Sequence, residues 1–356
     1  MSIPEGALVR IVDVWAQDAQ NAFLQIHQLL PSFSTISIDT EFPGCRDLNP
    51  PRREPSEDEH KYHIVKAHVD NMFLIQVGLT LTNDHGELPM LDGAYTAWQF
   101  NLRDFDISKD WYFPDSIQLL INAGIDFERN RREGIGLYTL GSLFLQHGLV
   151  FNKRIRYICY QGDMDLAYLV KAISGDRLPS TNIRFRQVVR AFFGAVYDIR
   201  VVQLEHFGTD CGLQGFCDKL GVQRIRGAAH QAGSDSLLTA SAYHTIKQRH
   251  LDRRQGSSDA QNPNPHISGL FYSSVFCNWF WFRFGGLVQD FWLETVELDR
   301  TGQFRFVSGS DSGLVSLWSG SLSQDWLLVS PVTGSVVLQF SGSVLYFVVA
   351  QFQFSG

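Results

Sequence analysis

Residues 34–44 read Ser-Thr-Ile-Ser-Ile-Asp-Thr-Glu-Phe-Pro-Gly. The β-branched residues and the Pro-Gly end predict a strand that runs into a turn. Successive side chains of a strand point to opposite faces, so Asp39 and Glu41 share one face, and Ile36 and Ile38 share the other. Two adjacent carboxylates repel each other unless a cation lies between them, or unless the strand is at a solvated sheet edge. This segment alone leaves both interpretations open.

Two further segments place a single acid at the start of a helix. Residues 157–170 predict a strand followed by a helix with Asp165 in its first turn, where an acid is also a common partner of the helix dipole. Residues 230–239 read His-Gln-Ala-Gly-Ser-Asp-Ser-Leu-Leu-Thr, and Ser234 or Asp235 could simply cap the helix. On a continuous helix His230 would lie about 140° from Asp235, so we expect it on the entering turn, folded back towards that acid. A lone histidine is usually structural, so neither segment is decisive by itself.

Taken together, the three segments resemble the DEDDh exonucleases, and most closely the Caf/Pop-type deadenylase subunit of the Ccr–Not complex. The resemblance covers about residues 8–248 in order and without large gaps. It is carried by DTEFPG (39–44), the Asp-x-x-Tyr-Leu pattern at 165–169 and HQAGSDSLLT (230–239), with further agreement at LIQVGLTL (74–81), WQFN (98–101) and PDSIQLL (114–120).

The resemblance implies a ribonuclease-H-like α/β fold with a central mixed sheet flanked by helices. It also implies a poly(A)-specific 3′→5′ exoribonuclease that shortens mRNA poly(A) tails and releases 5′-AMP. Asp39, Glu41, Asp165 and Asp235 would bind two divalent metal ions, Mg²⁺ or Mn²⁺, and His230 would be the general base. The residue types suit this chemistry, because hard carboxylate oxygens bind these hard cations and four carboxylates offset their charge.

The family also implies partners: the poly(A) 3′ end, a Not-type scaffold subunit and other Ccr–Not components. One departure is the run Tyr160-Gln-Gly-Asp-Met164, where the family usually has a Phe-His-Ser/Gly-Gly-Tyr-like run. Asp163 adds a carboxylate two residues before Asp165. Three alternatives stay open: an exonuclease acting on other 3′ ends, a catalytically weak or inactive Ccr–Not interaction subunit, and an α/β domain whose acids are surface charges.

The composition is that of a globular protein, with 44% hydrophobic and 19% charged residues and a net charge of −7. A non-specific duplex binder would carry a basic excess, so an RNA enzyme of this charge must hold its substrate locally, and bound metal ions are the obvious means. The five cysteines lack metal-site spacing and are expected to be reduced thiols. The first ten residues contain no signal-peptide core, and we expect a cytoplasmic and nuclear protein.

We predict three parts: a catalytic domain over residues 1–250, a polar linker over 251–268 and an atypical apolar tail over 269–356. Residues 270–356 contain no lysine or methionine but 12 of the 27 phenylalanines. The segment 332–352 is apolar, but glutamines and serines interrupt it and no basic flank orients it, so we expect no membrane span. We hypothesise that the tail is read-through of a retained intron or an incorrect gene model and not a selected domain. Continuous spliced transcript coverage across the codons for 249–270 would refute that hypothesis.

Apolar spacing and turn residues predict the local structure. We expect a helix over 7–30 and an exposed loop over 46–62. The remaining elements are strands at 73–82, 97–102 and 156–160, and helices at 114–124, 137–147, 163–173, 212–220 and 235–248.

Overall fold

The computed structural model describes residue 4, residues 6–45, 56–208 and 210–255, and six short strands between residues 280 and 338. The chain divides into two compact units, Met1–Phe271 and Tyr272–Gly356. Among the described residues, no helix is both long and apolar enough to cross a membrane. The functional residues predicted from the sequence all lie in the first unit.

A seven-stranded mixed sheet forms the centre of the first unit. Its strand order is β1-β5-β3-β2-β6-β7, and β4 pairs with β5. The β1–β5, β2–β6 and β6–β7 pairs are parallel, and the β2–β3, β3–β5 and β4–β5 pairs are antiparallel. This confirms the predicted central mixed sheet. The strands are β1 (Val9–Val14), β2 (Thr35–Glu41), β3 (Gln76–Thr82), β4 (Met90–Leu91), β5 (Ala94–Asn101), β6 (Arg156–Cys159) and β7 (Ala195–Asp198).

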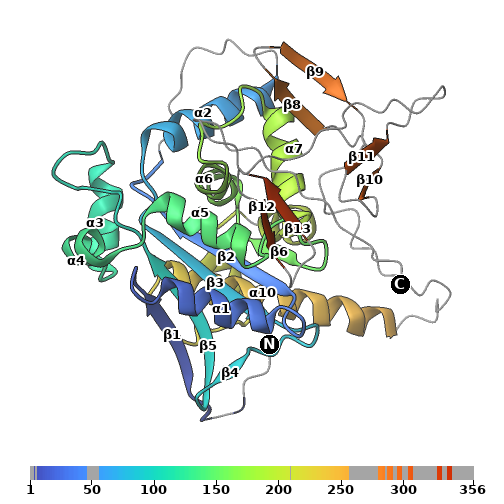
Figure 1. The fold of residues 1–356 in the computed structure, drawn as a ribbon. Helices are drawn as coiled ribbons and strands as arrows, with labels where there is room; N and C mark the ends of the chain where they lie inside the picture. Colours follow the sequence, from blue (N-terminus) through green and yellow to red (C-terminus); the bar gives the residue numbers. More distant parts are fainter. Residues whose placement is uncertain are drawn as a thin grey trace. The chain divides into compact units, whose positions relative to one another are not determined.

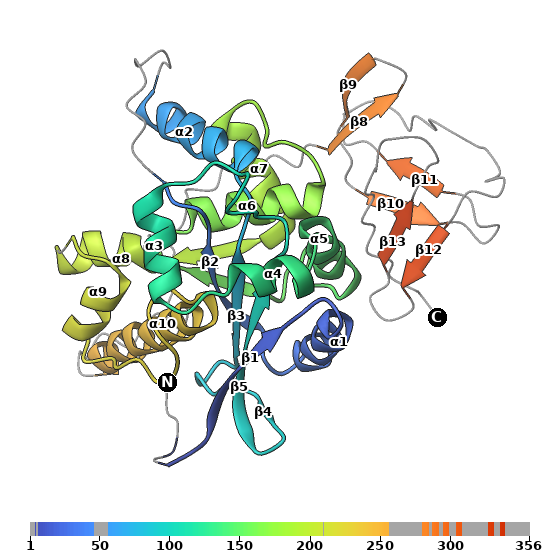
Figure 2. The same cartoon turned by 90° about the vertical axis from the view of Figure 1, so that its left-hand side faces the viewer.

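Helices cover both faces of this sheet (Figure 1). Figure 2 shows the sheet between α10, with α8 and α9, on one side and α1 and α5 on the other. The helices are α1 (Ala19–Leu29), α2 (Glu57–Asn71), α3 (Pro114–Asn122), α4 (Phe127–Glu133), α5 (Leu137–Gln146), α6 (Asp163–Ser174), α7 (Asn182–Phe193), α8 (Ile199–Val202), a π-helical turn (Gln203–Phe207), α9 (Leu213–Lys219) and α10 (Ala232–Gln255).

Strand β2 lies between β3 and β6, so its two faces meet different layers. Ile36 and Ile38 are almost fully buried in the main core, which also contains Phe23 of α1 and Phe144 of α5. Each such side chain contributes about 1.5–3 kcal/mol when it is buried. The alternation expected for residues 34–42 is therefore present, and it leaves the acids of β2 on the other face.

Two expectations for local structure were wrong. Residues 7–30 are not one helix, because Val9–Val14 form strand β1 and the helix begins only at Ala19. The run Val-Arg-Ile-Val-Asp-Val is rich in β-branched residues, and its backbone pairs with β5. The expected loop over 46–62 ends earlier, because α2 starts at Glu57. Ser56 caps that helix by accepting a hydrogen bond from the Glu59 amide (3.2 Å). Residues 46–55 lie outside the described part.

Helix α10 is longer than expected and continues to Gln255, into the segment predicted as a linker. Described parts of the second unit are three two-stranded antiparallel pairs. They are β8 (Phe280–Phe284) with β9 (Leu287–Phe291), β10 (Thr295–Leu298) with β11 (Phe304–Val307), and β12 (Leu327–Ser330) with β13 (Ser335–Leu338). The rest of the linker and tail lies outside the described residues, so the predicted division of the chain stays a prediction.

A glycine in β3 allows α10 to approach the sheet closely. Gly78 pairs with Asp39 in the β2–β3 ladder. A Cβ atom at Gly78 would lie 1.9 Å from the carbonyl oxygen of Ala232, the first residue of α10. No side chain larger than hydrogen therefore fits there, and this contact brings the start of α10 next to the acids of β2.

The substitution Gly78→Ala tests this packing. We expect it to lower the free energy of unfolding by about 1–3 kcal/mol or more, because the added methyl group would collide with backbone that has little room to move. Gly215→Ala is the matched control, since a Cβ there lies 3.4 Å from Cys211 and the residue is inside helix α9, where alanine is favoured. Urea unfolding measures both variants. An unchanged stability of Gly78→Ala would contradict the close contact.

Candidate active site

Strand β2 carries the first two predicted acids on the face that meets α10. Asp39 lies opposite Gly78 and Glu41 opposite Gln76 in the β2–β3 ladder. Both acids are partly buried. Two carboxylates therefore project from one face at the end of a strand that lies inside the sheet.

The third acid, Asp165, lies in the first turn of α6 and is buried. The hydroxyl of Thr40 in β2 donates a hydrogen bond to its Oδ1 (2.6 Å). The turn before α6 is held from the neighbouring strand, because the carboxylate of Asp198 accepts the backbone N–H groups of Gln161 (2.8 Å) and Gly162 (3.0 Å). Asp165 is thus fixed both through its own side chain and through the turn that precedes it.

The fourth acid, Asp235, lies in the first turn of α10, which begins at Ala232, and its side chain is buried. The backbone N–H of His230 donates to Asp235 Oδ2 (2.8 Å). His230 has a positive φ of 62°, so the chain bends back on itself just before the helix. His230 is therefore on the entering turn and folded towards Asp235, as the sequence predicted, and Asp235 is inside the helix and not at its cap.

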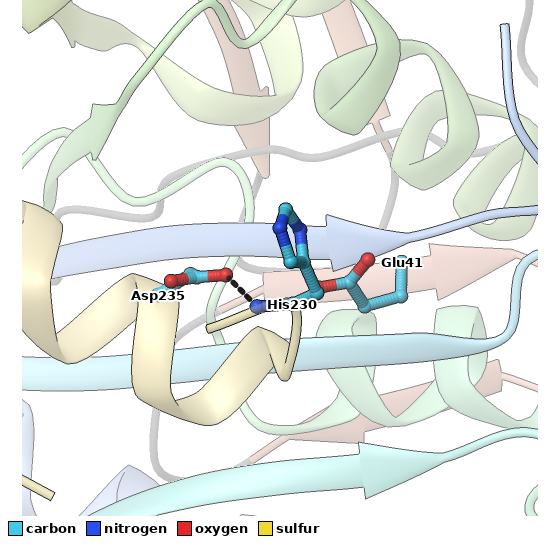
Figure 3. Close-up of side chains that lie close together, drawn as sticks. All are labelled: Glu41, His230 and Asp235. Atoms are coloured by element: carbon cyan, nitrogen blue, oxygen red, sulfur yellow. Dashed lines mark hydrogen bonds between the residues drawn. The ribbon is translucent and has the colours of Figure 1, made fainter. Parts of the chain in front are cut away.

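The structure brings three of the five predicted site residues close together at one end of the sheet, and Asp39 and Asp165 are near enough to repel these acids. Ligand-type atoms of Glu41, His230 and Asp235 all lie within 4.8 Å of one another. Figure 3 shows these three side chains side by side, with the hydrogen bond from the His230 backbone to Asp235. The His230 side chain is exposed, so its ring is accessible from solvent. These residues come from β2 and from the turn and helix at α10, almost two hundred residues later in the sequence.

Burial and mutual repulsion change the acidity of this cluster. Burial raises the pKa of Asp39 well above its ordinary value, and repulsion from Asp235 and Asp165 raises it further. The pKa of Glu41 is raised well above its ordinary value by burial and by the same two acids. Burial also raises the pKa of Asp165 to about 7, although the hydrogen bond from Thr40 acts in the opposite direction. Without a cation, burial and repulsion therefore favour the protonated, neutral forms of these acids.

The side chain of Arg224 also belongs to this cluster of acids, and it was not predicted from the sequence. Its Nη2 atom lies 2.7 Å from Asp235 Oδ1, and both side chains are largely buried, with 14% and 11% exposed. Thr40 and Asp198 were missed as well. Their contacts are with segments far away in the sequence, and no spacing marks such pairs in advance.

The unusual run at residues 160–164 has a structural role. The hydroxyl of Tyr160 donates to Gln203 Oε1 (2.6 Å) and accepts a hydrogen bond from Arg200 Nη1 (3.1 Å). Asp163 is exposed at the first position of α6. Asp165 lies near Asp39 despite the altered residues before it.

Comparison with known proteins identifies the family. A family model described as CAF1 family ribonuclease matches residues 14–141. The chain is 37% identical over 244 residues to "Probable CCR4-associated factor 1 homolog 10" of Arabidopsis thaliana, with 68% of this chain and 87% of that protein covered. It is 35% identical over 254 residues to "Poly(A) ribonuclease pop2" of Schizosaccharomyces pombe, covering 71% of this chain and 73% of that protein.

Solved structures agree with this result. The Mg²⁺- and Mn²⁺-bound form of S. pombe Pop2p matches with a TM-score of 0.64 at 36% identity, covering 70% of this chain and 95% of that chain. A yeast CAF1 structure co-crystallised with the NOT1 MIF4G domain matches with a TM-score of 0.58 at 26% identity, covering 70% and 93% of the two chains. The chain therefore belongs to the CAF1 family of ribonucleases.

Proposed function

We propose that the chain is a poly(A)-specific 3′→5′ exoribonuclease that shortens mRNA poly(A) tails and releases 5′-AMP. The observation that carries the proposal is the meeting of Glu41, His230 and Asp235 at the end of the sheet where Asp39 and Asp165 also lie. The relative from S. pombe is named a poly(A) ribonuclease, which supports poly(A) RNA as the substrate.

The acids suit divalent metal ions. Their oxygens are hard ligands, and crowded carboxylates with raised pKa values gain stability when a cation replaces their protons. We propose that Asp39, Glu41, Asp165 and Asp235 bind two ions, Mg²⁺ or Mn²⁺, the metals found with S. pombe Pop2p. Bound there, the ions would activate the attacking water and stabilise the leaving 3′ oxygen.

The remaining steps belong to the chain's own groups. The exposed ring of His230 lies within 4.8 Å of carboxylate oxygens of Glu41 and Asp235, beside the place where the attacking water would be held. We assign His230 as the general base that takes the proton of that water, a role for which imidazole is well suited. Thr40 keeps Asp165 oriented through its 2.6 Å hydrogen bond.

We further propose that the chain assembles with a Not-type scaffold and other Ccr–Not components, since a yeast CAF1 has been crystallised with the NOT1 MIF4G domain. Polyadenylated mRNA occurs in both the nucleus and the cytoplasm, and we propose that the chain is present in both. Fluorescence microscopy of the tagged chain would contradict this if the signal were confined to another compartment.

Removal of one acid tests the activity. We expect the wild-type chain with Mn²⁺ to shorten a 5′-labelled RNA ending in oligo(A) stepwise, releasing 5′-AMP. Asp39→Ala should lose at least about a hundredfold, because changes outside the direct ligands already cost 10–100-fold. Glu128→Ala is the control, since Glu128 is an exposed acid on α4.

Other outcomes would favour the alternatives. Equal activity on oligo(U) RNA or on DNA would indicate an exonuclease of broader specificity. A folded wild-type chain that binds Mn²⁺ without shortening RNA would indicate an inactive interaction subunit. The assay would then be repeated with a chain ending at Gln255, the end of α10. Regained activity would attribute the loss to the residues after α10.

The raised pKa values predict how stability depends on pH. In the metal-free folded chain the pKa of Asp165 is about 7, against 3.8 ordinarily. Between these values folded Asp165 binds more protons than it does in the unfolded chain, so its contribution to stability is fully present below about pH 4 and falls as the pH rises towards 7. We expect thermal unfolding in EDTA to show this loss between about pH 5 and about pH 7, and Mn²⁺ to restore stability mainly at the higher pH.

The variant Asp165→Asn isolates this effect from other titrations. It removes the titrating carboxyl but keeps the shape, so the loss of stability between the two pH values should be smaller than in the wild type. The same pH dependence in both proteins would contradict the raised pKa of Asp165.

A further inference from the structure

Arg224 connects three segments around the fourth acid. Its Nε donates to Gln214 Oε1 of α9 (3.1 Å), and its Nη1 donates to Ser234 Oγ (2.6 Å). Its Nη2 contacts Asp235 Oδ1 (2.7 Å). Nη1 also lies 3.4 Å from the carbonyl oxygen of Ala228, in the segment that leads to His230. The guanidinium group thus uses its planar shape to hold several partners at once.

These contacts fix the carboxylate of Asp235 from both sides. Oδ1 accepts from Arg224 and Oδ2 accepts from the backbone N–H of His230. Each carboxylate oxygen has two lone pairs, so both oxygens can still bind a cation while they keep these donors. Ser234 also donates to the carbonyl oxygen of Arg226 (2.7 Å), and this hydrogen bond ties the segment before His230 to the start of α10.

We propose that Arg224 is a positioning residue that holds the Asp235 carboxylate and the His230 turn in the arrangement needed for metal binding. This inference rests on the proposed function of the site. Arg224 acts through Asp235 and not on the substrate. It places a positive charge beside the acids, with its Nη2 atom 2.7 Å from Asp235 Oδ1.

A lysine at position 224 would keep the positive charge but would lose the planar guanidinium group with its several N–H donors. Its ammonium group is a point charge, and it cannot contact Gln214, Ser234 and Asp235 together in the same geometry. Arg224→Lys therefore separates positioning from simple charge compensation. Arg226→Lys is the matched control, because Arg226 lies two residues away and is exposed. Its backbone carbonyl oxygen contacts Ser234, and the substitution keeps that atom.

The experiment measures Mn²⁺ binding to the full chain by EPR, kcat and KM on oligo(A) RNA, and thermal unfolding in EDTA. We expect Arg224→Lys to weaken Mn²⁺ binding about tenfold, as loss of a charge-assisted hydrogen bond beside a metal ligand does. It should lower kcat at saturating Mn²⁺ and leave the KM for RNA within about twofold. Arg226→Lys should match the wild type in every measurement.

Arg224→Lys with wild-type Mn²⁺ affinity and kcat would overturn the proposal. If that variant unfolds at a much lower temperature, Gln214→Met decides, because it removes a partner of Arg224 outside the acid cluster. A smaller loss of Mn²⁺ affinity in folded Gln214→Met supports positioning, and no loss overturns it. If the wild type binds Mn²⁺ but neither the full chain nor the chain ending at Gln255 shortens RNA, the proposed function alone is refuted, because Mn²⁺ binding still tests Arg224. A wild type that binds no Mn²⁺ would refute both.

Discussion

The burial of neighbouring carboxylates, together with the repulsion between them, is the constraint on which the rest of the site depends. The fold brings four acids from β2, α6 and α10 to one end of a sheet whose β2 strand lies between two others. Burial and mutual repulsion raise the pKa of Asp39 and Glu41, and burial raises that of Asp165 to about 7. Such an arrangement is unfavourable by itself and becomes favourable when cations balance the charge. We propose that this unfavourable state of the free acids is the source of the affinity for metal ions.

The scaffold keeps the acids together by contacts of different kinds. Gly78 removes a side chain from the place where α10 meets the sheet. Thr40 ties Asp165 to β2, and Asp198 fixes the turn before it. Arg224 contacts the carboxylate of Asp235 on α10. The contacts of Gly78, Thr40 and Asp198 join segments distant in sequence, so the site depends on the packing of the sheet against its helices.

Much of the fold could be predicted from the sequence. The resemblance to the DEDDh exonucleases pointed to the four acids, whose role as metal ligands stays a prediction. From strand alternation we expected Asp39 and Glu41 on one face. From the spacing before α10 we expected His230 on a turn folded back towards Asp235. The strand β1 was missed because its apolar residues fit helical spacing as well, and only pairing with β5 decides between the two. The role of Asp198 could not be predicted, since its contacts with Gln161 and Gly162 depend on the pairing of β6 with β7. The role of Arg224 depends on how the chain before α10 folds back, which no spacing in the sequence shows.

The central claim is that these acids form a binuclear metal site, and Mn²⁺ stoichiometry tests it most directly. Equilibrium dialysis and EPR of the full chain should give two ions per chain with spin-coupled signals, as expected for ions about 4 Å apart. Asp39→Asn should abolish the coupled signal while the chain remains folded. A folded wild-type chain that binds no Mn²⁺, or whose binding is the same in Asp39→Asn, would contradict the account.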